Sequence, residues 1–146
     1  MAPAGRLNMT WYESMDQLPD IDDYDIIKGK RTYRYFDGNV LCPFGYSLPY
    51  TTFAYDNYKV SLKDNRLLEI SLDVKNIGST ASDEVVQIYG SAPASRVKKP
   101  ICQLLDFVRV KNIAPGETRH VALEISESVI MKQADQKMYE NKKSSR

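Results

Sequence analysis

The densest group of potential ligands in the sequence is an acidic run, Asp20-Ile-Asp22-Asp23-Tyr-Asp25. Hard cations such as Ca²⁺ prefer several oxygen ligands close together, and this run supplies carboxylates at short spacing. The spacing does not fit an EF-hand, because the run lacks the central glycine and the distal glutamate of that loop. We therefore expect a solvated acidic loop, and the sequence predicts neither a metal site nor a cofactor site.

Aromatic side chains are the second candidate chemistry, because the face of an aromatic ring can stack on a sugar ring. Most of the aromatic residues lie between Trp11 and Tyr58. So many large rings must find a surface to cover, so this part of the chain is not a flexible linker. We expect most of them to pack against other domains, with a contribution to the rim of a substrate site as the alternative. The candidates are Trp11, Tyr12, Tyr33, Tyr35 and Tyr46.

Nucleophilic and metal chemistry find little support elsewhere. His120 is the only histidine, and it follows Arg119 on the polar face of a predicted strand. Cys42 and Cys102 have no second ligand at the spacing of a zinc site. A disulfide between them is one alternative, and two free, partly buried thiols are the expectation. No catalytic residue is predicted.

Composition limits the class of partner. The chain has 146 residues, 42% of them hydrophobic and 27% charged, as in a folded globular protein. A net charge of +1 gives no electrostatic case for nucleic acid or an anionic membrane. No apolar run reaches the roughly 18 residues that a membrane helix needs. The first residues, Met1-Ala-Pro-Ala-Gly-Arg6, do not resemble a secretory signal, so localisation stays open between the cytoplasm and export with a parent chain.

The sequence divides into three unlike parts. Residues 1–50 have little periodicity and are expected to form an irregular strap, with one short strand at Arg31–Phe36 closed by the turn pair Asp37-Gly38. Residues 51–126 have the pattern of antiparallel strands. Residues 127–146 are rich in helix formers, with Ile130, Ala134 and Met138 at helical spacing, and predict an amphipathic helix.

The strand pattern is clearest where Leu68, Ile70, Leu72 and Val74 alternate with polar residues. Turn residues separate this run from the others, at Asn76-Ile-Gly78 and at Ala114-Pro-Gly-Glu117. With five strands and no helix between them, the fold class predicted is a mostly β, antiparallel sandwich. The other four strands are predicted at Phe53–Val60, Glu84–Tyr89, Leu104–Val110 and Arg119–Ile125.

Six motifs in a fixed order resemble the C-terminal region of family 3 glycoside hydrolases, covering the end of their α/β-sandwich domain and their fibronectin type III-like domain. The family versions are GRLPVTWY, GRTYRYFDG, YPFGYGLSYTTF, DEVVQLY, PIKQLKGFKRV and APGE. The corresponding segments here are Gly5–Tyr12, Gly29–Gly38, Cys42–Phe53, Asp83–Tyr89, Pro100–Val110 and Ala114–Glu117. Departures include Asn8 for proline, Ser47 for glycine and Pro49 for serine, and Ser47 would be strained if its φ were positive.

The resemblance implies an accessory β-sandwich of a β-glucosidase or β-xylosidase. In that family two carboxyl groups act on the glycosidic bond, and both come from domains upstream of the equivalent of Gly5. The resemblance therefore implies that this chain alone is not an enzyme and that its partners are the catalytic domains of the parent glycosidase, with oligosaccharide as a further candidate. It leaves the sugar specificity and the oligomeric state open.

The C-terminal end departs from this family. The final strand expected after Ile125 is not recognised, and Ala134–Arg146 resembles the closing helix of GGDEF diguanylate cyclases, ADKAMYEAKKSGR. The GGDEF loop and the metal carboxylates are not part of this resemblance, so no cyclase activity is implied. A stand-alone carbohydrate- or protein-binding sandwich, and a truncated or fused gene product without function, are the alternatives to the accessory domain.

Overall fold

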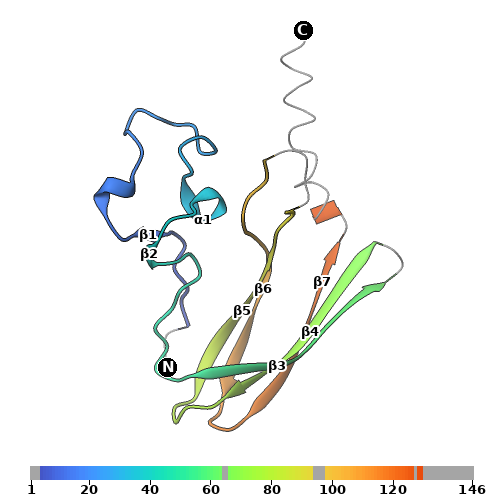
Figure 1. Ribbon diagram of the computed structural model, residues 1–146. Helices are drawn as coiled ribbons and strands as arrows, with labels where there is room; N and C mark the ends of the chain where they lie inside the picture. Colours follow the sequence, from blue (N-terminus) through green and yellow to red (C-terminus); the bar gives the residue numbers. More distant parts are fainter. Residues whose placement is uncertain (1–3, 64–65, 94–97, 127, 130–146) are drawn as a thin grey trace. The chain divides into compact units, whose positions relative to one another are not determined.

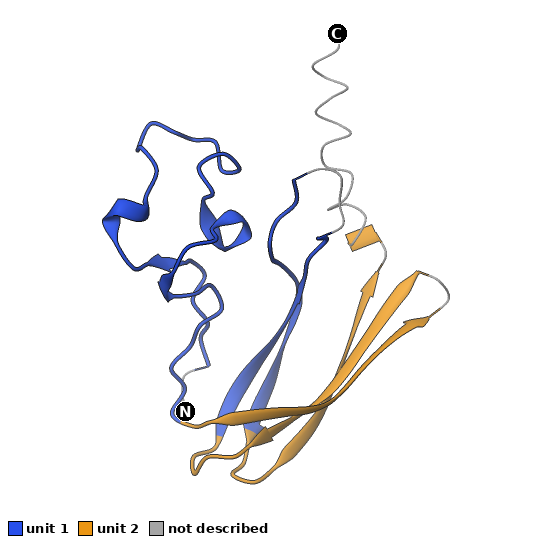
Figure 2. Ribbon diagram, viewed as in Figure 1, with its two compact units in different colours: residues 1–50, 82–112 blue, residues 51–81, 113–146 orange. Residues whose placement is uncertain are grey.

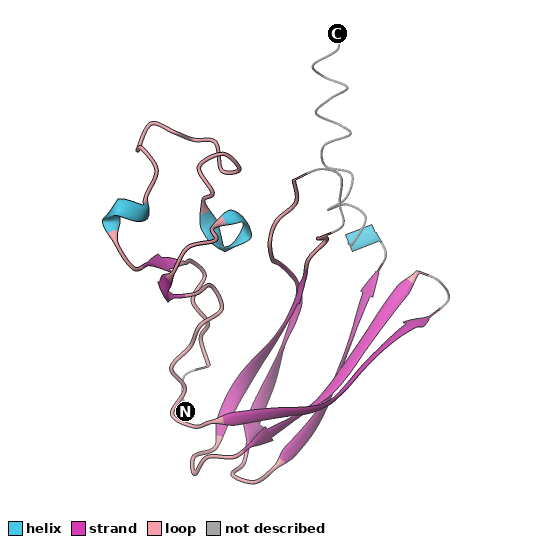
Figure 3. Cartoon of the chain, in the orientation of Figure 1, coloured by secondary structure: helices cyan, strands magenta, loops and turns pink. Residues whose placement is uncertain are grey.

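The computed structural model describes residues 4–63, 66–93, 98–126 and 128–129 (Figure 1). These residues form two compact units, which exchange the chain three times (Figure 2). Unit 1 contains residues 1–50 and 82–112, and unit 2 contains residues 51–81 and 113–146. Strands account for most of the regular structure in the described residues (Figure 3), and the predicted mostly β class is confirmed.

Unit 2 is built on a three-stranded antiparallel sheet with the order β3-β4-β7. The strands are β3 (Phe53–Lys63), β4 (Leu67–Asn76) and β7 (Thr118–Ser126). The alternation predicted for β4 is observed, since Leu72 is opposite Val121 and both are buried, with 2% and 6% of their surface exposed. Cross-strand apolar pairs on one face are what stabilise such a sheet.

The ends of these strands are joined through one buried side chain. Asn76, with no exposed surface, donates from Nδ2 to the carbonyls of Thr80 and Ile113, each at 2.9 Å. Its Oδ1 accepts from the Thr51 hydroxyl at 2.7 Å and from the Gly78 N–H at 3.0 Å. A residue expected only to form a turn therefore ties the two loops at that end of the sheet, because all its hydrogen-bonding groups are used.

Unit 1 contains a second sheet formed by β5 (Ser82–Gly90) and β6 (Gln103–Ile113 in full, with Ile113 in unit 2). Asp83 accepts from the Asn112 N–H at 2.8 Å, so the start of β5 lies beside the end of β6. A Cβ added at Gly90 would meet the Leu105 side chain, so the other ends also lie together and the strands run antiparallel. All five predicted strands are thus present.

The strap, residues 1–50, has short elements: β1 (Trp11–Tyr12), the 3₁₀ turn η1 (Met15–Gln17), the helical turn α1 (Thr32–Tyr35) and β2 (Val40–Cys42). β1 and β2 pair antiparallel, with Trp11 opposite Cys42. A capping box opens η1, because the Ser14 hydroxyl accepts from the Asp16 N–H while Gln17 Oε1 accepts from the Ser14 N–H.

The strand predicted at Arg31–Phe36 is wrong, because these residues form α1 and its flanks. The Phe36 N–H donates to the Thr32 carbonyl at 2.9 Å, closing one helical turn. Alternating aromatic residues suggested a strand, yet Tyr33 and Phe36 contact rings far away in sequence. Tertiary packing overrides the local pattern here, as it does for many short segments.

The helix predicted over residues 127–146 lies outside the described residues, except for Ser128 and Val129, which have helical backbone. Ser47 is not among the described residues with positive φ, so the strain considered at that position is not observed.

Candidate functional site

Three aromatic rings from distant parts of the sequence meet in unit 1. Tyr33 of α1 stacks on Phe44, with ring centroids 4.0 Å apart and planes 12° from parallel. Tyr89 of β5 meets both rings edge-on, with centroids 6.4 Å from each. Both geometries are favourable for aromatic pairs. The cluster therefore fixes the strap to β5.

Polar contacts fix the same turn of the strap to β6. The Leu104 N–H donates to the Tyr33 hydroxyl at 3.2 Å, and the Ile101 N–H donates to the Arg34 carbonyl at 2.7 Å. The Arg34 guanidinium donates to Gln103 Oε1 at 2.6 Å. Because these bonds involve both backbone and side chains, α1 has a defined orientation on the sheet.

A buried ion pair holds the start of the strap to β5. Glu84, 4% exposed, accepts from the Arg6 guanidinium and from the Val85 N–H at 2.8 Å. Arg6 also donates to the Gly45 carbonyl at 3.3 Å. A buried carboxylate needs such partners, since burying an unpaired charge costs several kcal/mol, on the order of 3–5 when one partner is removed. The pair therefore sets how the segment around Arg6 lies on β5.

A pocket of about 520 Å³ opens beside the aromatic cluster. Tyr89 donates its hydroxyl hydrogen to Gln87 Oε1 at 3.0 Å within this lining. Burial raises the pKa of Tyr89 and that of the Cys102 thiol, so both groups are protonated at neutral pH. The pocket thus offers aromatic faces and neutral hydrogen-bonding groups. Its lining comprises Thr10, Tyr33, Phe36, Gly38, Val40, Pro43, Phe44, Gly45, Tyr46, Gln87, Tyr89 and Cys102.

Gly45 is required at the wall of this pocket. Its φ is +82°, and an added Cβ would overlap the Tyr89 hydroxyl and Gln87 Oε1. Only glycine adopts this backbone conformation without strain. The glycine in Pro43-Phe-Gly45 was the one signal in the sequence that a close backbone approach occurs there.

The predicted aromatic residues separate into different places. Tyr33 and Tyr46 line the 520 Å³ pocket, and Tyr46 also lines a second pocket of about 360 Å³ with Trp11. Trp11 is 50% exposed. Tyr35 is half-buried and lies outside the linings of both pockets. Tyr12 packs edge-on against Phe36 at 4.6 Å and accepts from the Thr32 N–H at 3.2 Å, so it supports the strap itself.

Sequence reasoning missed Phe44, Tyr89, Gln87 and the pair formed by Arg6 and Glu84. Each of these except Gln87 lies in a motif that was compared with the family, but nothing in the local pattern separates a ring that stacks from one that fills a core. Cys42 and Cys102 are both free and partly buried, as expected.

The acidic loop uses its carboxylates within the chain. Asp25 Oδ1 accepts from the backbone N–H groups of Ile27 and Lys28, each at 2.9 Å, and these bonds lower the pKa of Asp25. The Arg31 guanidinium donates to the carbonyls of Asp20 and Asp23 at 2.8 and 2.6 Å. Within the described part of the chain, no group of three or more acidic, histidine or cysteine side chains could hold a metal ion.

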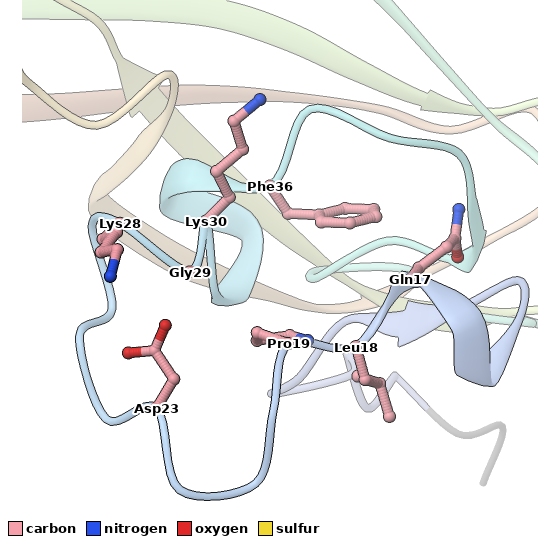
Figure 4. A pocket seen from close by; sticks show the side chains of 8 residues that line it. All are labelled: Gln17, Leu18, Pro19, Asp23, Lys28, Gly29, Lys30 and Phe36. Atoms are coloured by element: carbon pink, nitrogen blue, oxygen red, sulfur yellow. The ribbon is translucent and has the colours of Figure 1, made fainter.

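A shallow pocket of about 340 Å³ lies inside this loop (Figure 4). Its side chains come from the segment around Gln17–Pro19, from Asp23 and Lys28–Lys30, and from Phe36. Lys30, which contributes to its wall, donates to Asp37 Oδ2 at 2.6 Å. Because its charged groups already have partners along the chain, this pocket offers no free ligand set.

Comparison with known proteins agrees with the fold. The profile of the Fibronectin type III-like domain matches residues 84–132. A β-glucosidase of Kluyveromyces marxianus is 35% identical over 137 residues, which cover 86% of this chain and 16% of that protein. A xylan 1,4-β-xylosidase of Xylanibacter ruminicola is 46% identical over 88 residues, covering 60% of this chain and 10% of that protein.

Solved structures give the same result. β-Glucosidase 3B from Thermotoga neapolitana, in complex with glucose, superposes with a TM-score of 0.78 at 30% identity, over 88% of this chain and 20% of that chain. This chain spans about a sixth of the length of the first curated relatives, at 16% of each. None of the helices in the described residues is long and apolar enough to span a membrane. The chain carries a fibronectin type III-like domain with an antiparallel β fold, similar to the C-terminal region of family 3 β-glucosidases and β-xylosidases.

Proposed function

We propose that this chain is the accessory C-terminal part of a β-glycosidase, and that it supports catalytic domains without performing the hydrolysis itself. The similarity to β-glucosidases and β-xylosidases runs through both the strap and the strands, covering 86% of the chain in one relative. It covers only 16% of that relative's length. The parent's chemistry, with its two carboxyl groups, would then lie in domains outside this sequence.

The observation that carries this proposal is the exposed apolar surface of the strap. One set of strap side chains is fixed to β5 and β6 by the contacts described above, while another set is open to solvent. Single exposed apolar residues are ordinary, but so many in one short segment indicate an interaction surface. The most exposed are Met9, Trp11, Met15, Ile21, Tyr24, Leu41, Leu48 and Tyr50, with exposed fractions from 50% to 84%.

This proposal assigns a role to each predicted part of the chain. Residues 1–50 would be the strap that packs on the catalytic α/β domain, and residues 51–126 the fibronectin type III-like domain that holds the strap in place. Residues 127–146 would be a helix of separate origin, as their resemblance to the closing helix of GGDEF domains suggests. A sequencing read of the source DNA across both ends of the coding region tests that origin.

The first experiment measures hydrolysis of aryl β-glucosides and β-xylosides by the purified chain, and no turnover is expected. The second replaces the matching region of the Kluyveromyces marxianus β-glucosidase with this chain. The chimera is expected to unfold at a higher temperature than the same enzyme with the region deleted, and to retain more activity. Turnover by the purified chain, or a chimera no more stable than the deletion, would overturn the proposal.

The exposed residues of the strap can be tested within that chimera. Substituting Trp11 and Leu48 with serine is expected to lower the thermal midpoint of the catalytic domains. The matched control is Phe107→Ser on β6, because Phe107 is also exposed, at 61%, but lies outside the strap. Equal effects of the two substitutions would count against the strap as the interdomain surface.

A second candidate function is binding of oligosaccharide by a stand-alone domain. The pocket of about 520 Å³ favours it, because its wall combines aromatic rings with the side chain of Gln87. Titration with cello- and xylo-oligosaccharides, followed by Trp11 fluorescence and by NMR, separates the two functions. Saturable binding to the isolated chain supports this second candidate, and no change in either signal removes it.

A further inference from the structure

One face of the unit 2 sheet is buried on two strands and exposed on the third. Its rows are set by the register: Val60 of β3 lies opposite Ile70 of β4, which lies opposite Leu123 of β7. Paired residues point to the same face of a sheet. Leu123 is only 6% exposed, whereas Val60 is 65% exposed. An apolar row thus passes from a buried position to an open one within a single sheet.

The next row repeats the contrast. Leu62 lies opposite Leu68, which lies opposite Ile125, and the exposed fractions of the outer two are 62% and 2%. Tyr58, two residues before Val60, is 66% exposed and shares this face by the alternation of the strand. We call Tyr58, Val60 and Leu62 the β3 stripe. It lies on a strand at the edge of the sheet, where natural proteins usually place polar residues or a cover.

The chain itself leaves the sheet beside this stripe. Ser126, the last residue of β7, lies opposite Leu67, and Leu67 lies opposite Lys63 at the end of β3. Ser126 and Ser128 are joined through their hydroxyl oxygens at 2.8 Å, and Ser128 and Val129 have helical backbone. The chain therefore changes from strand to helical conformation at the end of the sheet where Leu62 is exposed.

The sequence that follows has the properties of a cover. Ile130, Ala134 and Met138 recur at a spacing that places them on one face of a helix. A helix over residues 127–143 would be about 25 Å long. The β3 stripe, from Tyr58 to Leu62, spans about 13 Å of strand. Length, starting point and apolar pattern thus match one another.

We propose that the segment from residue 127 to residue 143 folds back on unit 2 and covers the β3 stripe with Ile130, Ala134 and Met138. The segment would then act as an intramolecular cover for an edge strand, whatever its evolutionary origin. It would prevent β3 from associating with a second copy of the chain. This inference does not depend on the proposed function as a glycosidase accessory domain.

Photo-cross-linking in the full-length chain tests the proposal. p-Benzoylphenylalanine is introduced in place of Tyr58, and the irradiated protein is digested with trypsin and analysed by mass spectrometry. The expected product is an intramolecular cross-link to the peptides 133–137 or 138–142. Met138→Lys is expected to lower the cross-linked fraction about tenfold, the change in population that loss of one buried apolar contact produces.

Two controls make the outcomes decisive. The same photoreactive residue in place of Phe107, which is 61% exposed in unit 1, reports random collisions with the C-terminal segment. A cross-linked dimer from the Tyr58 position would assign the stripe to a second copy and overturn the proposal. A yield no higher than that of the Phe107 control, or one unchanged by Met138→Lys, would also overturn it.

Discussion

The strap and the unit 2 sheet are held together by different forces. In the sheet, a continuous backbone ladder joins β3, β4 and β7, and rows of aliphatic side chains are buried on one face. In the strap, regular elements are no longer than four residues. Its position on β5 and β6 instead depends on a few side chains, such as Tyr33 and Arg6.

This difference predicts two kinds of response to substitution. A change in the sheet should act through lost apolar contacts and the volume left empty, and should affect the sheet as a whole. A change at one contact of the strap should release the strap while the sheet remains folded. Trp11, the only tryptophan, lies in the strap, so its fluorescence reports the strap while far-UV circular dichroism reports mainly the strands.

The largest effect is expected from Ile125→Ala in β7. Ile125 is 2% exposed, and shortening a buried isoleucine to alanine costs about 2–5 kcal/mol. Urea unfolding followed by circular dichroism should show this loss in the free energy of unfolding. Thr118→Ala, at an exposed position of the same strand, is the control and should change it by less than about 0.5 kcal/mol. Equal losses from the two substitutions would contradict the assignment of Ile125 to the core.

Arg6→Ala should release the strap with a slightly smaller effect. The substitution leaves the buried Glu84 carboxylate without its ion-pair partner, which costs on the order of 3 kcal/mol. The Trp11 transition is expected at lower urea than the transition of the strands. Adding Glu84→Gln to Arg6→Ala removes the unpaired charge and should recover part of the loss. If the double variant were less stable than Arg6→Ala alone, the buried pair would not be the cause.

Tyr33→Leu should weaken the same attachment by less. Stacking of Tyr33 on Phe44 contributes about 0.5–1.5 kcal/mol beyond the area that the ring buries. Tyr33→Phe keeps the ring and removes only the hydroxyl that accepts from the Leu104 N–H. The Trp11 transition should therefore shift more for the leucine variant than for the phenylalanine variant. The reverse order would make the hydrogen bond, and not the stack, the principal contact.

The two regions also differ in how far the sequence predicted them. The alternation from Leu68 to Val74 predicted β4 because burial on one face of a strand leaves a period of two in the sequence itself. The helical turn α1 could not be predicted in this way, because Tyr33 takes its place from Phe44 and Tyr89, which lie far along the chain. Likewise, the sequence indicated a turn at Asn76 but not its complete burial, which depends on carbonyls from two other segments.

The candidate site follows the same rule. Tyr33 and Tyr46 were named in advance because aromatic residues are conspicuous in a segment poor in periodicity. Glu84 was not, because a charged residue inside a strand usually faces solvent, and only the position of Arg6 explains its burial. Spacing therefore indicated which residues could contribute, while the partners that decide their roles required the structure.

The smallest effect at neutral pH, and the one that compares the two units most directly, concerns two aspartates whose pKa values are lowered. In unit 1, the Asn112 N–H and the Arg109 guanidinium lower the pKa of Asp83. In unit 2, the Asn57 side chain and His120 lower the pKa of Asp73. A carboxylate whose folded pKa is lowered contributes stability that is present above its unfolded pKa and is lost as the pH falls through the folded value.

Both contributions should therefore be intact at neutral pH and disappear below the ordinary aspartate pKa of 3.8. Asp83 is 5% exposed and joins β5 to β6, whereas the side chain of Asp73 is 24% exposed and one of its partners, His120, is 65% exposed. Solvent screens the second site more strongly. Asp83→Asn should thus flatten the acid dependence of the unfolding midpoint more than Asp73→Asn does. Equal flattening by the two variants would show that the buried network of unit 1 has no greater share in acid stability than the exposed one of unit 2.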